Sequence, residues 1–198
     1  KLLNMSNDLY ETENYLDGGW TEEPTSMVTQ RTYIGDAIGS FYMLKSVGVV
    51  ESGPQKGLWL IEDPETGEAV PFESGMRNYD SRFRQYCGSA LPKLTMGWSN
   101  TLRFYGVDVT MSFSGQFGYK IFNCQRMFYE NLNIGLNRYK SATQPVYGTT
   151  LAKSQQPVAV SYYLEDGDYL KLDNFTVGYT FNTKNVKYLD KARVYLSG

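Results

Sequence analysis

The longest regular alternation of apolar and polar residues runs through residues 93–117 and is interrupted once, at Tyr105 and Gly106. The apolar positions on one face are Leu94, Met96, Trp98, Leu102 and Phe104 before the interruption, and Val107, Val109, Met111, Phe113 and Phe117 after it. Alternation with a period of two is typical of a β-strand with unlike faces. Strands of soluble proteins usually have about 5 to 6 residues, whereas strands that cross a membrane at a tilt need about 9 to 11. The pattern therefore predicts a long hairpin of a membrane β-barrel.

A two-residue turn at Tyr105-Gly106 fixes the register of this hairpin. Trp98 then lies opposite Phe113, and Thr101 lies opposite Thr110. Arg103 lies opposite Asp108 on the polar face, and a cross-strand ion pair is favoured there over a contact with substrate.

Shorter patterns predict four further strands. Two of them, near residues 27–34 and 40–50, flank a tight turn at 35–39. Another covers 169–181, where the alternation changes phase at Asp173-Asn174 and indicates a β-bulge. After a turn near 182–191, a last strand begins at Ala192. The chain is predicted to be all-β.

Long and short connections alternate between these strands, as in outer-membrane barrels. We expect the short turns to be periplasmic and the long segments 51–91 and 120–167 to be extracellular loops. Within the second loop, residues 126–140 have an apolar spacing that allows a helix, which Gly135 weakens.

Composition narrows the class of protein. With 41% hydrophobic residues and a mean hydropathy of -0.42, the chain has no run of about 18 apolar residues that would make a transmembrane helix. Its 17 Tyr, 10 Phe and 3 Trp fit aromatic girdles at a membrane interface, or alternatively a tyrosine-rich binding surface. A net charge of -2 gives no reason to expect nucleic-acid binding.

Catalysis is not expected. The chain has no histidine, which removes the commonest general base and its nucleophile pairs. Glu165, Asp166 and Asp168 imitate a carboxylate pair for glycoside hydrolysis, but such acids beside Gly167 are typical of a solvated turn. Two cysteines without histidine do not form a standard zinc site, and no metal or other cofactor is predicted.

Four segments, taken in order, resemble one family. They are IGDAIGSFYMLKSVGVV, CGSALPKLTMGWSNTLRFYGVDVTMSFSGQFGYKIFN, YYLEDGDYLKLDNFTVGYTF and ARVYLSG. These are similar to segments of SusC/RagA-like TonB-dependent outer-membrane transporters. Where many relatives have D-x-N-x-D-G, this chain has EDPETGEAV, so no calcium-like loop is carried over.

The resemblance implies that residues 1–198 are part of one 22-stranded barrel domain, without the plug domain and the final strands. It also implies import of an oligosaccharide or a peptide across the outer membrane of a Gram-negative bacterium. The implied partners are membrane lipid, a SusD-like lipoprotein lid, TonB through the missing N-terminal part, and a second transporter-lid pair. The rival hypothesis is a soluble all-β glycan-binding module with an aromatic platform, for which the stretch SYYLEDGDYL offers tyrosines.

Individual site residues follow from the strand faces. The predicted lumen-facing positions are Arg103, Asp108, Gln116 and Lys171. Continuing the hairpin register beyond the membrane brings Cys87 opposite Cys124, which leaves open either a disulfide or two free buried thiols. Asn100 falls on the apolar face, where the pattern gives no reason for a polar amide.

Overall fold

The computed structural model describes residues 15–21, 26–78, 80–135, 137–183, 188 and 191–198. They divide into two compact units. Unit 1 takes the described residues up to 91 together with 120–166, and unit 2 takes 92–119 and 167–198. Unit 2 therefore consists of two segments that are each continuous in sequence with unit 1. That all 198 residues are part of one barrel domain stays a prediction.

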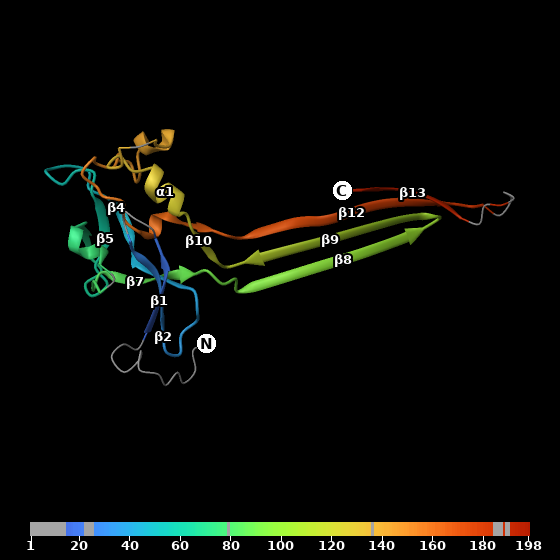
Figure 1. Ribbon diagram of the computed structural model, residues 1–198, viewed down its shortest axis with the longest axis horizontal. Coiled ribbons are helices and arrows are strands. Elements are labelled where there is room, and N and C mark those ends of the chain that lie inside the picture. The colour runs from blue at the N-terminus through green and yellow to red at the C-terminus, as the bar shows by residue number, and fades with distance from the viewer. Residues whose placement is uncertain (1–14, 22–25, 79, 136, 184–187, 189–190) are drawn as a thin grey trace. The chain divides into compact units, whose positions relative to one another are not determined.

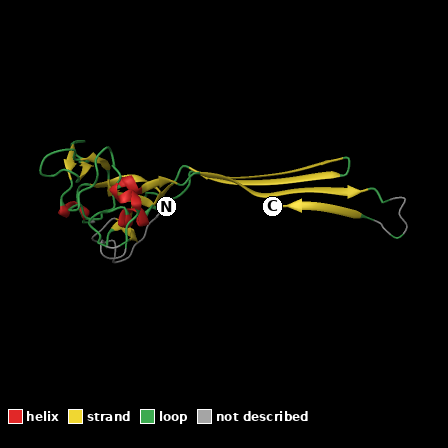
Figure 2. Ribbon diagram, turned by 90° about the horizontal axis from the view of Figure 1, so that it is seen from above, coloured by secondary structure: helices red, strands yellow, loops and turns green. Residues whose placement is uncertain are grey.

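Unit 2 is one antiparallel sheet in the order β13-β12-β9-β8 (Figure 1 and Figure 2). Its strands are β8 (Leu94–Phe104), β9 (Val107–Phe117), β12 (Tyr169–Phe181) and β13 (Ala192–Ser197). β8 and β9 have 11 residues each, and β12 has 13. These three lengths match those expected for tilted membrane-crossing strands.

The predicted hairpin register is confirmed. Trp98 pairs with Phe113, Thr101 with Thr110 and Arg103 with Asp108, around a turn in which both Tyr105 and Gly106 have positive φ. Such φ values are those of a type I′ turn, whose twist matches the strands it joins. The predicted bulge is confirmed as a register shift between Leu172 and Asn174, where β12 pairs with β9. Most of the predicted turn near 182–191 lies outside the described residues.

Unit 1 contains three small sheets. The first has the order β1-β2-β3-β7, the second β4-β5-β6 and the third β10-β11. Their strands are β1 (Tyr15–Trp20), β2 (Val28–Tyr33), β3 (Ser40–Leu44), β4 (Ser46–Val49), β5 (Trp59–Glu62), β6 (Ala69–Pro71), β7 (Arg84–Ser89), β10 (Lys120–Phe122) and β11 (Leu164–Asp166). Single 3₁₀ turns occur at Ser74–Arg77, Lys140–Thr143 and Ser161–Tyr163.

The strand pair predicted near 27–34 and 40–50 exists, but its assignment as membrane strands is wrong. β2, β3 and β4 have six, five and four residues, which is too short to cross a membrane. β2 and β3 are mostly buried on both faces. β4 belongs to a different sheet from β2 and β3. The alternation in this region reflects two-sided packing in unit 1.

Of the helix predicted over 126–140, only residues 126–129 are α-helical among the described residues, as the second part of helix α1 (Cys124–Tyr129). The Asn123 side chain accepts a hydrogen bond from the Arg126 N–H (3.0 Å) and caps its start. The chain leaves the helix at Glu130, well before Gly135, and Leu136 lies outside the described residues. In the described part of the chain, no helix has the length and apolar character needed to cross a membrane.

The core of unit 1 joins segments that are far apart in sequence. Trp59 of β5 is fully buried, and its backbone N–H donates to Oε1 of the buried Gln155 (3.0 Å). The Ser46 backbone N–H donates a hydrogen bond to the Ser161 hydroxyl (3.0 Å), and the two serine hydroxyls also share a hydrogen bond (3.3 Å). The Ala152 N–H donates to the Gly57 carbonyl (2.9 Å). The predicted loops 51–91 and 120–167 are therefore folded and packed against each other.

Candidate functional site

The two faces of the unit 2 sheet differ in chemistry. On one face, pairing lines up apolar residues across all four strands: Leu102, Val109, Val177 and Leu196 form one row, and Phe104, Val107, Tyr179 and Val194 form the next. The five apolar residues of β8 on this face, Leu94, Met96, Trp98, Leu102 and Phe104, are 41–56% exposed. A soluble protein rarely exposes so continuous an apolar surface, so this face requires a cover.

The opposite face carries polar residues and includes every predicted lumen-facing residue. Arg103, Asp108, Gln116 and Lys171 all fall on it by register. Ser99 and Ser112 are joined by a hydrogen bond between their hydroxyl oxygens (2.5 Å), as are Thr101 and Thr110 (3.3 Å). Lys171 forms an ion pair with Asp173 of the bulge (2.8 Å). The structure thus groups the four residues on one face, and their exposure to a lumen stays a prediction.

Asp108 forms its ion pair with Arg193 of β13 instead of the predicted Arg103. The Arg193 Nε lies 3.1 Å from Asp108 Oδ1, and its Nη2 bonds the other carboxylate oxygen. β12 lies between these two strands, and Gly178 stands directly opposite Asp108. A Cβ at Gly178 would lie 2.6 Å from Arg193 Nη2 and 2.9 Å from Asp108 Oδ1. The missing side chain therefore leaves room for a bidentate bridge across three strands.

Asn100 lies on the apolar face opposite Met111, as the register predicts. It is half-buried, on β8 at the outer edge of the four-stranded sheet. Nothing in the structure explains the amide at this position.

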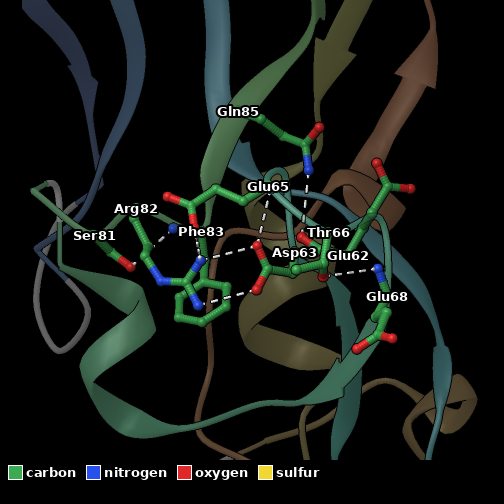
Figure 3. A network of polar contacts seen from close by, with 9 residues as sticks. All are labelled: Glu62, Asp63, Glu65, Thr66, Glu68, Ser81, Arg82, Phe83 and Gln85. Carbon is green, nitrogen blue, oxygen red and sulfur yellow. Dashed lines mark hydrogen bonds and ion pairs between the residues drawn. The ribbon is translucent and has the colours of Figure 1, made fainter.

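The EDPETGE segment of unit 1 is closed by an arginine (Figure 3). Arg82 binds both oxygens of Asp63 (3.0 Å each) and one oxygen of Glu65 (2.9 Å). Hydrogen bonding from the Glu65 N–H and from the Arg82 guanidinium holds the pKa of Asp63 below its usual value. A guanidinium thus binds two of the four acidic side chains of this segment, Asp63 and Glu65.

The acidic residues near 165 have structural partners. Glu165 accepts hydrogen bonds from Arg126 (2.7 Å) and Asn123 (3.1 Å), and the Arg126 hydrogen bond, its largest influence, lowers the Glu165 pKa. Asp166 pairs with Lys120 in unit 1, and Asp168 accepts the Gly118 N–H in unit 2. In the nearby tyrosine stretch, Tyr163 is buried, and Tyr162 packs against Trp59 and Arg126. These two tyrosines belong to the core of unit 1.

Of the two alternatives that the sequence left open for Cys87 and Cys124, the structure has free cysteines, because the hairpin register ends before it reaches them. The last pair is Leu94 with Phe117, after which β7 pairs with β3 and β10 pairs with β11. Cys87 and Cys124 are free. The Cys87 Sγ donates a hydrogen bond to the Met43 carbonyl (3.6 Å), and burial raises its pKa to about 11.

One group of residues was missed from the sequence: a row of tyrosines across the first sheet of unit 1. Each of the four strands supplies one, namely Tyr15, Tyr33, Tyr42 and Tyr86. Tyr15 pairs with Tyr33 and Tyr42 pairs with Tyr86, while the Tyr33 and Tyr42 rings meet edge to face with centroids 6.1 Å apart. The sequence places Tyr33 and Tyr42 on either side of the predicted turn at 35–39, but it contains no signal that adds Tyr15 and Tyr86 to them.

The chain is similar to proteins of one kind in sequence and in fold, although no family model matches it. It is 28% identical over 184 residues to TonB-dependent receptor P3 of Formosa agariphila, which covers 86% of this chain and 18% of that receptor. The solved structure of the RagAB peptide transporter matches 95% of this chain and 20% of its own, with 21% identity and a TM-score of 0.69. The RagAB peptide importer in its closed-closed state gives a TM-score of 0.67 at the same identity.

The structural matches establish the fold, and the sequence match carries the resemblance to TonB-dependent receptors. Together they confirm the similarity of this chain to SusC/RagA-like transporters and its largely antiparallel β fold. The chain spans about a fifth of the length of the proteins it matches.

Proposed function

We propose that this chain, as a stretch of a SusC/RagA-like TonB-dependent transporter, supplies barrel wall and extracellular loops for import of a nutrient across the outer membrane of a Gram-negative bacterium. The observation that carries the proposal is the apolar face of unit 2, continuous over four strands and exposed. Lipid is the cover that such a face fits, because β8 and β9 have the length of membrane-crossing strands.

Topology supports an orientation. The Tyr105-Gly106 turn is short and is therefore proposed to be periplasmic, while the folded segments 51–91 and 120–166 of unit 1 are proposed to be extracellular. The polar face with Arg103, Asp108, Gln116 and Lys171 is then proposed to face the lumen of a 22-stranded barrel. Four strands cannot close such a barrel, and an open edge is not tolerated in lipid, so the remaining strands are proposed to come from elsewhere in a longer chain.

The substrate is proposed to be an oligosaccharide or a peptide. The matched RagAB is described as a peptide importer, which keeps peptides in consideration. The proposed partners are a SusD-like lipoprotein lid, TonB through another part of the protein, and a second transporter-lid pair. The rival hypothesis of a soluble glycan-binding module is disfavoured, because the outward face of β8 stays largely apolar over residues 94–104.

The test is isolation of the native polypeptide that contains the Leu94–Phe117 hairpin, followed by mass spectrometry and an uptake assay. We expect a chain several-fold heavier than 22.5 kDa in the detergent-extracted outer membrane, with a lipoprotein companion. Uptake of a labelled nutrient should disappear when TonB is deleted. Recovery of a 22.5 kDa chain from the soluble fraction would contradict the proposal.

A further inference from the structure

Three tyrosines of the row in unit 1, Tyr33, Tyr42 and Tyr86, form one wall of an open cavity of about 430 Å³. Its lining comes from the first sheet and from the turn between β2 and β3, and comprises Arg31, Tyr33, Asp36, Ala37, Ser40, Tyr42 and Tyr86. Sites for small molecules typically have about 300 to 1,000 Å³ and combine aromatic walls with a few placed polar groups. The size and lining of this cavity therefore fit a ligand of one or a few rings.

The wall is built rigidly. The Tyr33 and Tyr42 rings meet at an interplanar angle of 82°, an edge-to-face contact that holds both rings in place. On the turn that carries Asp36, the Asp36 N–H donates to the Tyr33 carbonyl (3.0 Å) and the Ser40 hydroxyl donates to the Ala37 carbonyl (2.8 Å). Little ordering of the protein is then needed when a ligand binds.

Tyr86 differs from the other tyrosines of the row. Its side chain is 61% exposed, and among the residues that the structure describes its ring makes no contact with another ring or a cation. An aromatic face that is free and held by a β-strand is suited to stacking against an apolar ring face of a ligand. Tyr86 is therefore the platform of the cavity.

The charges of the cavity disfavour an anionic ligand. Arg31 is the one cation in the lining, and both oxygens of Asp17 already bind it (2.7 and 2.9 Å). Its guanidinium also lies 3.6 Å from the centroid of the Tyr15 ring, and it is 6% exposed. The remaining charge is the exposed carboxylate of Asp36, for which no ion pair occurs in the described part of the chain. A carboxylate accepts hydrogen bonds from hydroxyl groups but repels sulfate and carboxylate groups.

We infer that this cavity is a binding subsite for a neutral sugar residue, with Tyr86 stacking on the sugar ring and Asp36 accepting hydrogen bonds from its hydroxyls. The inference rests on the proposed import function and specifies its substrate as a neutral oligosaccharide. Tyr33 and Tyr42 close the side of the subsite with fixed rings, and the neutralised Arg31 adds no attraction for acidic sugars.

The experiment measures binding of defined oligosaccharides to the full-length transporter, purified in detergent, by isothermal titration calorimetry. The probes are neutral hexasaccharides of glucose, xylose and mannose, an oligogalacturonate, a sulfated oligosaccharide and a lysine-containing peptide. We expect a neutral hexasaccharide to bind with an affinity that stays constant between about 50 and 500 mM salt, because no ion pair is involved.

Variants locate the binding. Tyr86→Ala should weaken the affinity about tenfold or more, because the stacking surface is lost. Tyr86→Phe should keep most of it, and Asp36→Asn should weaken it less than Tyr86→Ala does. Tyr129→Ala, which removes another exposed tyrosine of unit 1, is the matched control and should leave the affinity unchanged.

Failure of the inference is distinguishable from failure of the proposed function. If no neutral hexasaccharide binds, if only the acidic probes or the peptide bind, or if Tyr86→Ala binds like wild type, the subsite assignment is overturned. TonB-dependent uptake of another substrate in the same strain would still support an importer. Absence of the full-length chain from the outer membrane would overturn both.

Discussion

The two units of this chain differ in how far their apolar side chains are buried, as one tryptophan from each unit shows. Trp59 of unit 1 is fully buried among residues of both segments of that unit, whereas Trp98 of unit 2 is 49% exposed and stacks on Phe113 across the hairpin. Unit 1 therefore contains the core that stabilises it. Unit 2 has the pattern of a core face but, in the described part of the chain, no protein layer over it, so we expect the lipid of the proposed membrane to stabilise it.

The largest expected effect comes from Trp59→Ala in the full-length transporter. Removing a fully buried tryptophan costs about 3 to 5 kcal/mol, and the loss should unfold unit 1 locally. Limited proteolysis in detergent should then cut within 51–91 and 120–166 while unit 2 stays protected. Trp98→Ala is the matched control and should leave unit 1 resistant. Equal cleavage of unit 1 in both variants would show that it has no independent core.

A positive charge placed on either face of the unit 2 sheet should show the difference between its apolar and polar faces. Met111→Arg puts a cation on the apolar face near the middle of β9, and a cost of about 2 to 4 kcal/mol is expected if lipid covers it. Thr110→Arg puts the same cation one residue away on the polar face. We expect urea titration in lipid vesicles to show lower stability for Met111→Arg alone. The assignment of the two faces would be reversed if Thr110→Arg were the more harmful change.

The thiols of unit 1 offer a kinetic test. Burial raises the pKa of Cys87 to about 11, so the neutral thiol prevails at pH 8 and the reactive thiolate appears only as the pH approaches 11. Labelling of Cys87 with iodoacetamide at pH 8, followed by peptide mass spectrometry, should be at least about 100-fold slower in the native protein than in the denatured one, where the pKa of a cysteine thiol is about 8.5. The denatured, non-reduced protein should show both thiols of Cys87 and Cys124. Detection of neither thiol would favour the other alternative, a disulfide between Cys87 and Cys124.

The smallest effect is expected from Gly178→Ala on the polar face. The new methyl group would contact both partners of the Arg193–Asp108 bridge and should separate them. Because this bridge is exposed to solvent in unit 2, we expect a slight lowering of the urea midpoint, well below that of Met111→Arg. Asp108→Asn provides the comparison, since it weakens the bridge without adding bulk. A midpoint that rises in Gly178→Ala would contradict the role assigned to this glycine.

The sequence predicted unit 2 well because its information is local. Eleven alternating residues on each side of Tyr105-Gly106 determine both the faces and the register, and the change of phase at Asp173 marks the bulge directly. The partner of Asp108 was predicted incorrectly, because Arg103 is its neighbour within the hairpin whereas Arg193 arrives from β13. The residues around Gly178 in the sequence do not indicate that the missing side chain leaves room for Arg193 to reach Asp108.

Unit 1 was predicted less well because its contacts are distant in sequence. The buried pairing of Trp59 with Gln155 joins positions separated by 96 residues, and short strands buried on both faces lack a clear period. The tyrosine row depends on the strand order and on a register shift between Phe41 and Tyr42. Neither can be obtained from the spacing of tyrosines along the chain.

The pairing of β10 with β11 also affects the order of assembly. β9 and β12 are neighbours in unit 2, yet about 50 residues of chain separate them, and closing a loop of that length costs conformational entropy before any strand contact repays it. Lys120–Phe122 and Leu164–Asp166 pair at the two ends of this intervening chain, so the loop is already closed where β9 ends and β12 begins. If β10 and β11 pair first, the entropy cost of closing this connection is met within unit 1, and we then expect β9 and β12 to pair more readily than strands joined by a free loop of the same length.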